Sequence, residues 1–229
     1  MKKIVLVNPD IELLQDRFGT VTLTKLKAQP PLGLCSIAAT LEGFGHTVNI
    51  VDGYAESLTP TKLADRVLEL NPQLVGFTVT CLNAEQAELT ATLIKQRNND
   101  ITIVFGGPQT TLQSDSALDC PAVDYAVLGE GDLTFPKLVE TVEDNGDLSK
   151  IPGIIWRDSA AHPKLTAPPV PVDDLDSLPL PARHLLNWGQ YNLSGDYLIP
   201  AKKVMTLSSS RGCPYQCTFC SSAVYWKCS

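Results

Sequence analysis

Residues 74–107 read LVGFTVTCLNAEQAELTATLIKQRNNDITIVFGG. Two short apolar runs, Leu74–Thr80 and Ile101–Phe105, flank the segment Ala84–Asn98, which is long enough to form a helix. Runs that are apolar on both faces are typical of parallel strands covered by helices on both sides. This stretch therefore predicts a strand–helix–strand unit with parallel strands.

The same alternation of short apolar runs and longer segments continues over residues 1–146. Further strands are expected at Ile4–Asn8, Thr47–Asp52 and Ala122–Leu128. Further helices are expected at Leu32–Gly43, Thr61–Leu70, Thr111–Leu118 and Leu133–Glu143. Five such units in order predict a doubly wound, flavodoxin- or Rossmann-like α/β domain with a five-stranded parallel sheet. Such sheets bind ligands at the carboxyl ends of their strands.

The pattern changes after the first domain. Residues 147–200 are expected to hold a hairpin, Gly153–Arg157 with His162–Thr166, and then a proline-rich extended linker. Residues 201–229 begin a third segment, in which the strand Val204–Leu207 leads into a cysteine-rich loop.

Composition excludes several classes of protein. The 229 residues are 44% hydrophobic and 19% charged, which excludes a disordered or fibrous chain. The net charge of −7 leaves no basic stripe for nucleic acid. No apolar run approaches the roughly 20 residues that span a bilayer, and none resembles an export signal, so we expect a cytoplasmic protein. Seven cysteines, an odd number, then favour metal or redox chemistry over disulfides.

Three of the cysteines, Cys213, Cys217 and Cys220, form a CxxxCxxC motif. Three thiolates on one short loop can surround a single metal centre. Structural zinc and 4Fe–4S clusters both normally take four ligands, so three cysteines leave one iron of a cluster open to another molecule. Structural zinc with Cys228 or His184 as a distant fourth ligand is the alternative.

This motif, with Phe219 directly before its last cysteine and an apolar strand ahead of it, resembles the radical S-adenosylmethionine (SAM) superfamily. The resemblance implies that the three cysteines hold a 4Fe–4S cluster whose fourth iron chelates SAM. One electron from the cluster then cleaves SAM to methionine and a 5′-deoxyadenosyl radical. By the same resemblance Phe219 lies against the adenine of SAM, and Arg211 and Tyr215 support the loop.

The first domain resembles the cobalamin-binding domain that precedes many radical SAM barrels. The resemblance depends on the segments Pro30–Leu34, Gly45–Val48, Gly106–Gln109 and Leu128–Asp132. The cobalamin-binding residues that it implies are Pro31, Gly33, Thr78, Thr80, Gly106, Gly107, Gly129, Glu130 and Gly131. Glycines at strand ends suit this role because they let the backbone approach a large planar ligand, although tight turns also use them.

No lower axial histidine is expected for the cobalamin. Cobalamin domains of the methionine-synthase type supply one from a DxHxxG motif, where this chain has KAQPPLG at residues 27–33. His46 starts the second strand and is expected to be a surface or capping residue. The same absence also permits a domain that has lost cobalamin.

The sequence therefore predicts an enzyme, a cobalamin-dependent radical SAM protein that transfers methyl groups or carries out a radical cyclisation or rearrangement. Its partners would be a small organic substrate and an electron donor such as flavodoxin or ferredoxin. The alternatives are a non-catalytic cobalamin carrier or sensor, and a radical SAM enzyme without cobalamin. Asp10 and Asp52 also suggest a phosphoacceptor domain, which the glycines and the cysteine motif disfavour.

The expected barrel is incomplete. A closed (β/α) barrel takes about 250 residues, whereas residues 201–229 hold only its first strand and the cysteine loop. We therefore expect an amino-terminal fragment that is inactive alone, with poor packing in about the last 30 residues.

Overall fold

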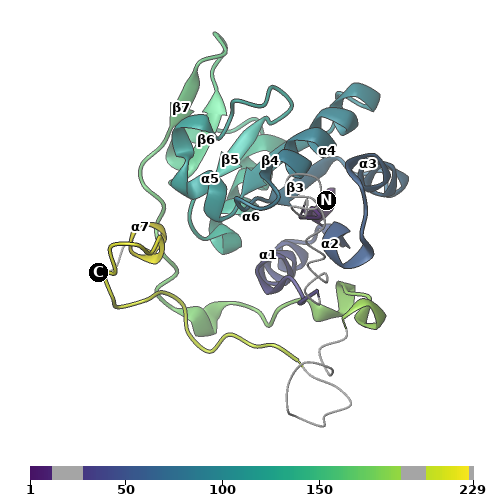
Figure 1. Ribbon diagram of the computed structural model, residues 1–229. Helices are drawn as coiled ribbons and strands as arrows, with labels where there is room; N and C mark the ends of the chain where they lie inside the picture. The colour runs from purple at the N-terminus through teal and green to yellow at the C-terminus, as the bar shows by residue number, and fades with distance from the viewer. Residues whose placement is uncertain (12–27, 192–204, 227–229) are drawn as a thin grey trace.

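The computed structural model describes residues 1–11, 28–191 and 205–226, and their strands form a single sheet (Figure 1). The strands are β1 Lys3–Asn8, β2 Thr47–Asp52, β3 Leu74–Thr78, β4 Thr102–Gly106, β5 Tyr125–Val127, β6 Ile154–Arg157 and β7 Pro163–Leu165. Their order in the sheet is β2–β1–β3–β4–β5–β6–β7. Strands β1 to β5 pair in parallel, which confirms the doubly wound core.

The expected count of five strands is wrong, because β6 and β7 join the same sheet. They form the expected hairpin, and β6 pairs antiparallel with β5. Without β6, the outer edge of β5 would expose a row of unpaired backbone groups, so the hairpin extends the sheet at the edge where such groups are costly.

Helices cover both faces of the sheet. They are α1 Leu32–Gly43, α2 Gly53–Glu56, α3 Pro60–Glu69, α4 Ala84–Arg97, α5 Pro108–Leu112, α6 Gly131–Glu143 and α7 Ser222–Tyr225. Short 3-10 turns lie at Ser114–Ser116, Leu148–Lys150, Leu175–Ser177, Arg183–Leu185 and Trp188–Gln190. Helix α1 packs beside α6 on one face, and α3 packs beside α4 on the other.

One expected helix is misplaced. The helix predicted at Thr111–Leu118 instead begins at Pro108 and ends at Leu112. Proline fits the first turn of a helix, where its missing N–H is not needed, and Gln113 then leaves the helical conformation with a φ of −120°.

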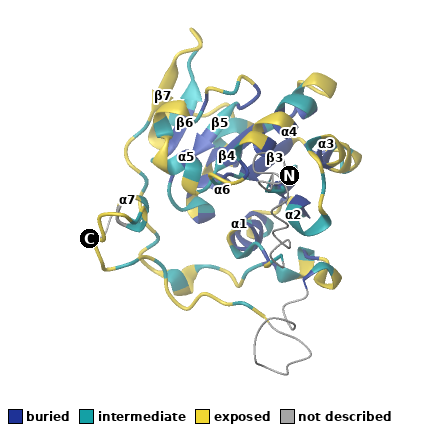
Figure 2. Cartoon of the chain, in the orientation of Figure 1, coloured by how far each residue is buried: buried dark blue, intermediate teal, exposed yellow. Residues whose placement is uncertain are grey.

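The core has two layers because successive residues of each strand face opposite sides. In β1, Ile4 and Leu6 pack toward α1 and α6, while Val5 and Val7 pack toward α3 and α4. All four side chains are at most 1% exposed, and the neighbouring strand β3 is mostly dark blue in Figure 2, whereas the outer strand β7 is exposed. In β3, a Cβ on Gly76 would lie 2.9 Å from the Phe135 ring, so glycine lets α6 approach the sheet.

The linker returns to the first domain. The N–H of Ala182 donates to the carbonyl of Cys35, and Leu186 and Tyr191 pack against that cysteine. The Tyr191 hydroxyl donates to Oδ2 of Asp52 at 2.8 Å. Residues 182–191 therefore lie against the first domain.

The strand expected at Val204–Leu207 is not found. Residues 205–207 belong to no strand, and Val204 lies outside the described residues. A strand requires a hydrogen-bonded neighbour, and no strand of the described part pairs with this segment. The long connection Pro9–Pro31 falls mainly on residues 12–27, which also lie outside the described residues.

None of the helices in the described ranges is long and apolar enough to cross a membrane.

Candidate functional site

A pocket of about 880 Å³ opens at the carboxyl edge of the parallel sheet. Thr78, Gly106 and Val127, the last residues of β3, β4 and β5, lie along it. The first turns of α1 and α6 form its walls, and residues 175–183 and 207–212 close over it. The pocket therefore occupies the edge where doubly wound sheets bind ligands.

Most of the cobalamin-binding residues predicted from the sequence lie along this pocket. Those that do are Gly33, Thr78, Gly106, Gly107, Gly129, Glu130 and Gly131. Pro31 does not line it and instead precedes α1, where its carbonyl accepts the N–H of Cys35 at 3.1 Å.

Thr80 does not line the pocket either. Strand β3 ends at Thr78, so the alternation that would place both threonines on one face stops before Thr80. The N–H and the hydroxyl of Thr80 both bond to Oδ1 of Asn83, at 2.7 and 3.1 Å. Thr80 therefore stabilises the turn into α4.

The pocket glycines fall into two groups. A Cβ on Gly33 would meet no atom within 4 Å, and one on Gly106 would make only ordinary contact with Val127, at 3.5 Å from its carbonyl oxygen, so neither position is closed to a side chain by the fold. A Cβ on Gly131 would lie 2.8 Å from Cδ1 of Ile37, and one on Gly107 would lie 2.8 Å from the Val79 carbonyl. The first pair leaves room for a ligand, and the second pair allows the chain itself to pack.

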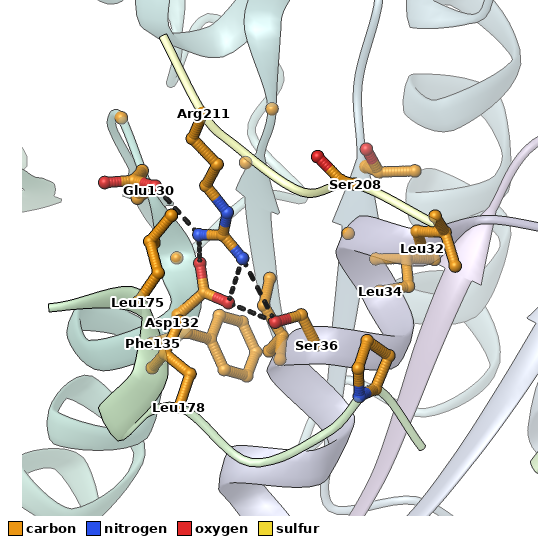
Figure 3. Close-up of a pocket in the computed structure, with 18 of the residues that line it drawn as sticks. Leu32, Leu34, Ser36, Glu130, Asp132, Phe135, Leu175, Leu178, Ser208 and Arg211 are labelled. Carbon is orange, nitrogen blue, oxygen red and sulfur yellow. Dashed lines mark hydrogen bonds and ion pairs between the residues drawn. The ribbon is translucent and has the colours of Figure 1, made fainter. Parts of the chain in front are cut away.

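A buried ion-pair cluster lies in the pocket (Figure 3). One guanidinium nitrogen of Arg211 contacts Glu130 Oε1 at 2.8 Å and Asp132 Oδ2 at 2.7 Å. The other contacts Asp132 Oδ1 at 3.1 Å and the Ser36 hydroxyl at 3.3 Å. The Glu130 and Asp132 side chains are only 8% and 7% exposed. These hydrogen bonds, with that to Asp132 foremost, raise the pKa of Arg211 despite its burial.

Tyr225 makes a second contact between the carboxyl-terminal segment and the same loop. Its hydroxyl donates to the carbonyl of Gly129 at 3.2 Å. Burial, followed by the nearby carboxylates of Glu130 and Asp132, raises the pKa of this tyrosine. The residues on both sides of the cysteine motif thus contact the loop 129–132.

The cysteine motif lies outside the pocket lining. Cys217 is exposed, Cys213 and Cys220 are half-buried, and Phe219 is 91% exposed. The N–H of Cys220 donates to the Cys217 carbonyl at 3.0 Å, and hydrogen bonds from Ser222 lower the pKa of the Cys220 thiol.

The donor types of this loop suit an iron–sulfur cluster, but the described structure does not show an assembled site. Within the described ranges, no three His, Cys, Asp or Glu side chains are arranged to hold a metal ion. Of the alternative zinc ligands, Cys228 lies outside the described residues, and His184 Nε2 lies 3.1 Å from Glu42 Oε1. Packing of the tail is mixed, because Arg211 and Tyr225 are anchored while the loop between them is exposed.

Of the two roles expected for His46, that of a surface residue is wrong, and a capping role agrees with its contact. It is 8% exposed rather than at the surface, and its Nδ1 accepts the N–H of Lys2 at 3.2 Å. It lies next to the first residue of β2, at the amino edge of the sheet and away from the pocket. None of the described residues that line the pocket is a histidine.

Sequence reasoning missed the partners of Arg211. The sequence pattern does not mark Ser36, and it marks Asp132 only as part of a glycine-rich segment. The available signal was a pair of acids, Glu130 and Asp132, at the start of a helix that opens on the ligand-binding edge. No local pattern links them to Arg211, about 80 residues later in the chain.

The sequence of this chain is similar to a known domain family and to known proteins. Residues 20–139 match the model of the B12 binding domain. An uncharacterised methyltransferase of Pyrococcus horikoshii is 34% identical over 97% of this chain and 46% of its own length. An anaerobic magnesium-protoporphyrin IX monomethyl ester cyclase of Synechocystis sp. is 31% identical over 98% of this chain and 43% of its own length. The chain thus spans a little under half of either relative.

Among solved structures, the apo form of the cobalamin-dependent S-adenosylmethionine radical enzyme OxsB has a similar fold. It aligns with a TM-score of 0.70 and 20% identity, covering 96% of this chain and 28% of that chain.

Proposed function

Because this chain belongs to the B12-binding domain family, we propose that its pocket at the carboxyl edge of the sheet binds cobalamin. One observation is the main support for this proposal. Bare backbone at Gly33 and Gly106 faces a pocket of about 880 Å³ within the segment that matches the family. A flat macrocycle needs such side-chain-free surfaces in order to lie close to the backbone.

The lining residues suit the different parts of the ligand. Leu6, Val127 and Phe135 supply apolar surface, and the Thr78 hydroxyl supplies a hydrogen-bonding group. Helix α1 begins at the pocket without an acidic side chain in its first turn, and helix amino ends favour the negative charge of a phosphate such as that of the cobalamin nucleotide. We propose that the lower face of cobalamin has no histidine ligand, because residues 27–33 read KAQPPLG in place of a DxHxxG motif.

We further propose that Cys213, Cys217 and Cys220 hold a 4Fe–4S cluster with one iron open to SAM, and that Phe219 lies against the adenine. When bound, such a cluster supplies the electron for reductive cleavage of SAM. The three thiolates would have to gather around the cluster, since they are not arranged for it in the described structure. The exposure of Cys217 and Phe219 leaves the loop accessible for this rearrangement.

The relatives support a reaction class for the whole protein. Their names describe a methyltransferase and a cyclase. We propose methyl transfer or a radical cyclisation or rearrangement of a small organic substrate, with flavodoxin or ferredoxin as the kind of electron donor.

A hydroxocobalamin titration followed by absorbance tests the pocket. Gly33→Leu fills open space in the pocket and should weaken cobalamin binding about tenfold or more, equal to about 1.4 kcal/mol. Gly43→Leu is the matched control, because Gly43 ends the same helix, also faces open space and does not line the pocket. Absence of binding by the parent chain, or equal binding by both variants, would overturn the proposal.

Anaerobic reconstitution with iron and sulfide tests the cysteine loop. The parent chain should take up about four irons, as a 4Fe–4S cluster requires, whereas a Cys213→Ala/Cys217→Ala/Cys220→Ala variant should take up none. Cys81→Ala, at an exposed cysteine outside the motif, should behave like the parent. Cobalamin binding without iron would instead indicate a non-catalytic carrier or sensor, and iron without cobalamin a radical SAM enzyme that has lost it.

A further inference from the structure

Arg211 is the anchored residue of an otherwise exposed segment. It lies two residues before Cys213. Its neighbours Ser210 and Gly212 are exposed, whereas its own side chain is 25% exposed and enters the pocket (Figure 3). The contacts of its guanidinium therefore fix where the chain enters the cysteine loop.

The acceptors of Arg211 are held in place by other parts of the chain. Glu130 Oε2 accepts the N–H of Val172 at 2.7 Å, and Asp132 Oδ1 accepts the hydroxyl of Ser36 at 2.5 Å. Two buried carboxylates this close together repel each other and have lost water, so a cation between them is strongly favoured. The planar fork of arginine meets both oxygens of Asp132, and lysine cannot reproduce that geometry.

The other end of the cysteine loop is tied to the same place. Tyr225 lies five residues after Cys220, and its hydroxyl contacts the Gly129 carbonyl. The eight-residue motif is thus bracketed by two anchors on the loop 129–132, which also lines the pocket.

From this geometry we propose that Arg211 is a positioning residue: it docks the CxxxCxxC loop on Glu130 and Asp132 of the pocket loop, with Tyr225 as the second anchor. The role rests on the proposed function, because docking would set the place of an iron–sulfur cluster relative to the cobalamin pocket. The docking itself can be measured without any cofactor, because both anchors are contacts within this chain.

Hydrogen–deuterium exchange of the full chain tests the docking. Helix α7 has only four residues, too few to be stable alone, so the protection of its Tyr225 and Trp226 amides reports docking. Arg211→Gln should speed their exchange at least about tenfold, and Arg211→Lys should give a smaller increase. Unchanged exchange in β1 and β3 would show that the domain remains folded.

Two further variants sharpen this test. Arg97→Gln is the matched control, because Arg97 pairs with Asp65 at the surface and neither residue lines the pocket. It should leave exchange at Tyr225 and Trp226 unchanged. Asp132→Asn combined with Arg211→Gln should fall well short of the sum of the two single effects, because both substitutions remove the Arg211–Asp132 ion pair. Equal exchange in Arg211→Gln and the parent, or full additivity of the pair, would overturn the proposal.

Cofactor measurements on the same samples separate this inference from the proposed function. If exchange rises in Arg211→Gln while the parent binds neither cobalamin nor iron, the docking stands and the proposed function fails. If both cofactors bind and exchange does not change, the docking fails alone. Loss of α7 protection when hydroxocobalamin binds the parent would also overturn it, because Arg211 would then compete with the ligand.

Discussion

Replacing Gly107 with alanine should destabilise the domain by about 2–4 kcal/mol. Gly107 has a φ of +102° and a ψ of −175°, a region that is essentially restricted to glycine and costs other residues about 1–3 kcal/mol. A Cβ there would also lie 2.8 Å from the Val79 carbonyl oxygen and 3.0 Å from its nitrogen. The smaller backbone entropy of unfolded alanine offsets only about 0.4–1 kcal/mol of this cost.

The clash cannot be relieved cheaply, because its partner is backbone that is already hydrogen-bonded. The N–H of Val79 donates to the Gly106 carbonyl at 2.7 Å, and the Val79 carbonyl accepts the N–H of Gln109 at 3.0 Å. Moving Val79 away would weaken these bonds, each worth about 0.5–1.5 kcal/mol. The strain would therefore remain in the folded state.

Urea unfolding followed by far-ultraviolet circular dichroism measures the effect. With an m-value of about 2 kcal/mol/M, Gly107→Ala should lower the midpoint by about 1–2 M. Gly43→Ala, at a helix-end glycine with open space and no positive φ, should change stability by about 0–1 kcal/mol in the favourable direction. Equal midpoints for Gly107→Ala and the parent would show that the backbone at residue 107 is not strained.

Two other predictions concern buried polar groups. Burial lowers the pKa of His46, so the unfolded chain takes up its proton near the ordinary value of about 6.5 while the folded chain resists. The free energy of unfolding should therefore fall as the pH drops from about 7 through the folded pKa of His46. The urea midpoint of His46→Gln, which keeps an acceptor for the N–H of Lys2, should fall less over the same pH range than that of the parent. Tyr191→Phe removes a hydrogen bond to buried Asp52 and should cost about 1.5–3 kcal/mol, with faster proteolysis near residue 191; an unchanged midpoint and cleavage rate would contradict it.

The parallel core could be predicted from sequence because each of its strands is buried on both faces. Apolar runs such as Ile4–Asn8 leave few alternatives to a covered parallel strand. Gly106 ends a strand and Gly107 and Gly129 come shortly after strands, so their place at the carboxyl edge follows from the same pattern. The hairpin was also predicted, but its pairing with β5 was not, since no local feature of Ile154–Arg157 identifies the edge that it joins.

The parts of the site that escaped prediction depend on contacts between distant residues. Thr80 follows the alternation of β3 in sequence, yet the strand ends at Thr78 and Asn83 holds Thr80 in a turn. Arg211 reads from sequence as a residue near the cysteines, and only the fold brings it to Asp132. His46 reads as the polar start of a strand, and only tertiary packing buries it.

The two groups of pocket glycines allow a final test, which asks which glycines the folded backbone requires and which leave room for a ligand. The folded backbone requires glycine at residue 107, because its conformation and its contact with Val79 exclude a side chain even without a ligand. Gly33 has neither constraint, so nothing in the folded chain itself requires glycine there. Gly33→Leu should therefore keep the free energy of unfolding within about 0.5 kcal/mol of the parent value, as most surface substitutions do. The same variant should weaken cobalamin binding about tenfold or more, equal to about 1.4 kcal/mol. A loss of stability equal to that of Gly107→Ala would mean that Gly33 also serves the fold, and its place in the pocket would no longer indicate a ligand.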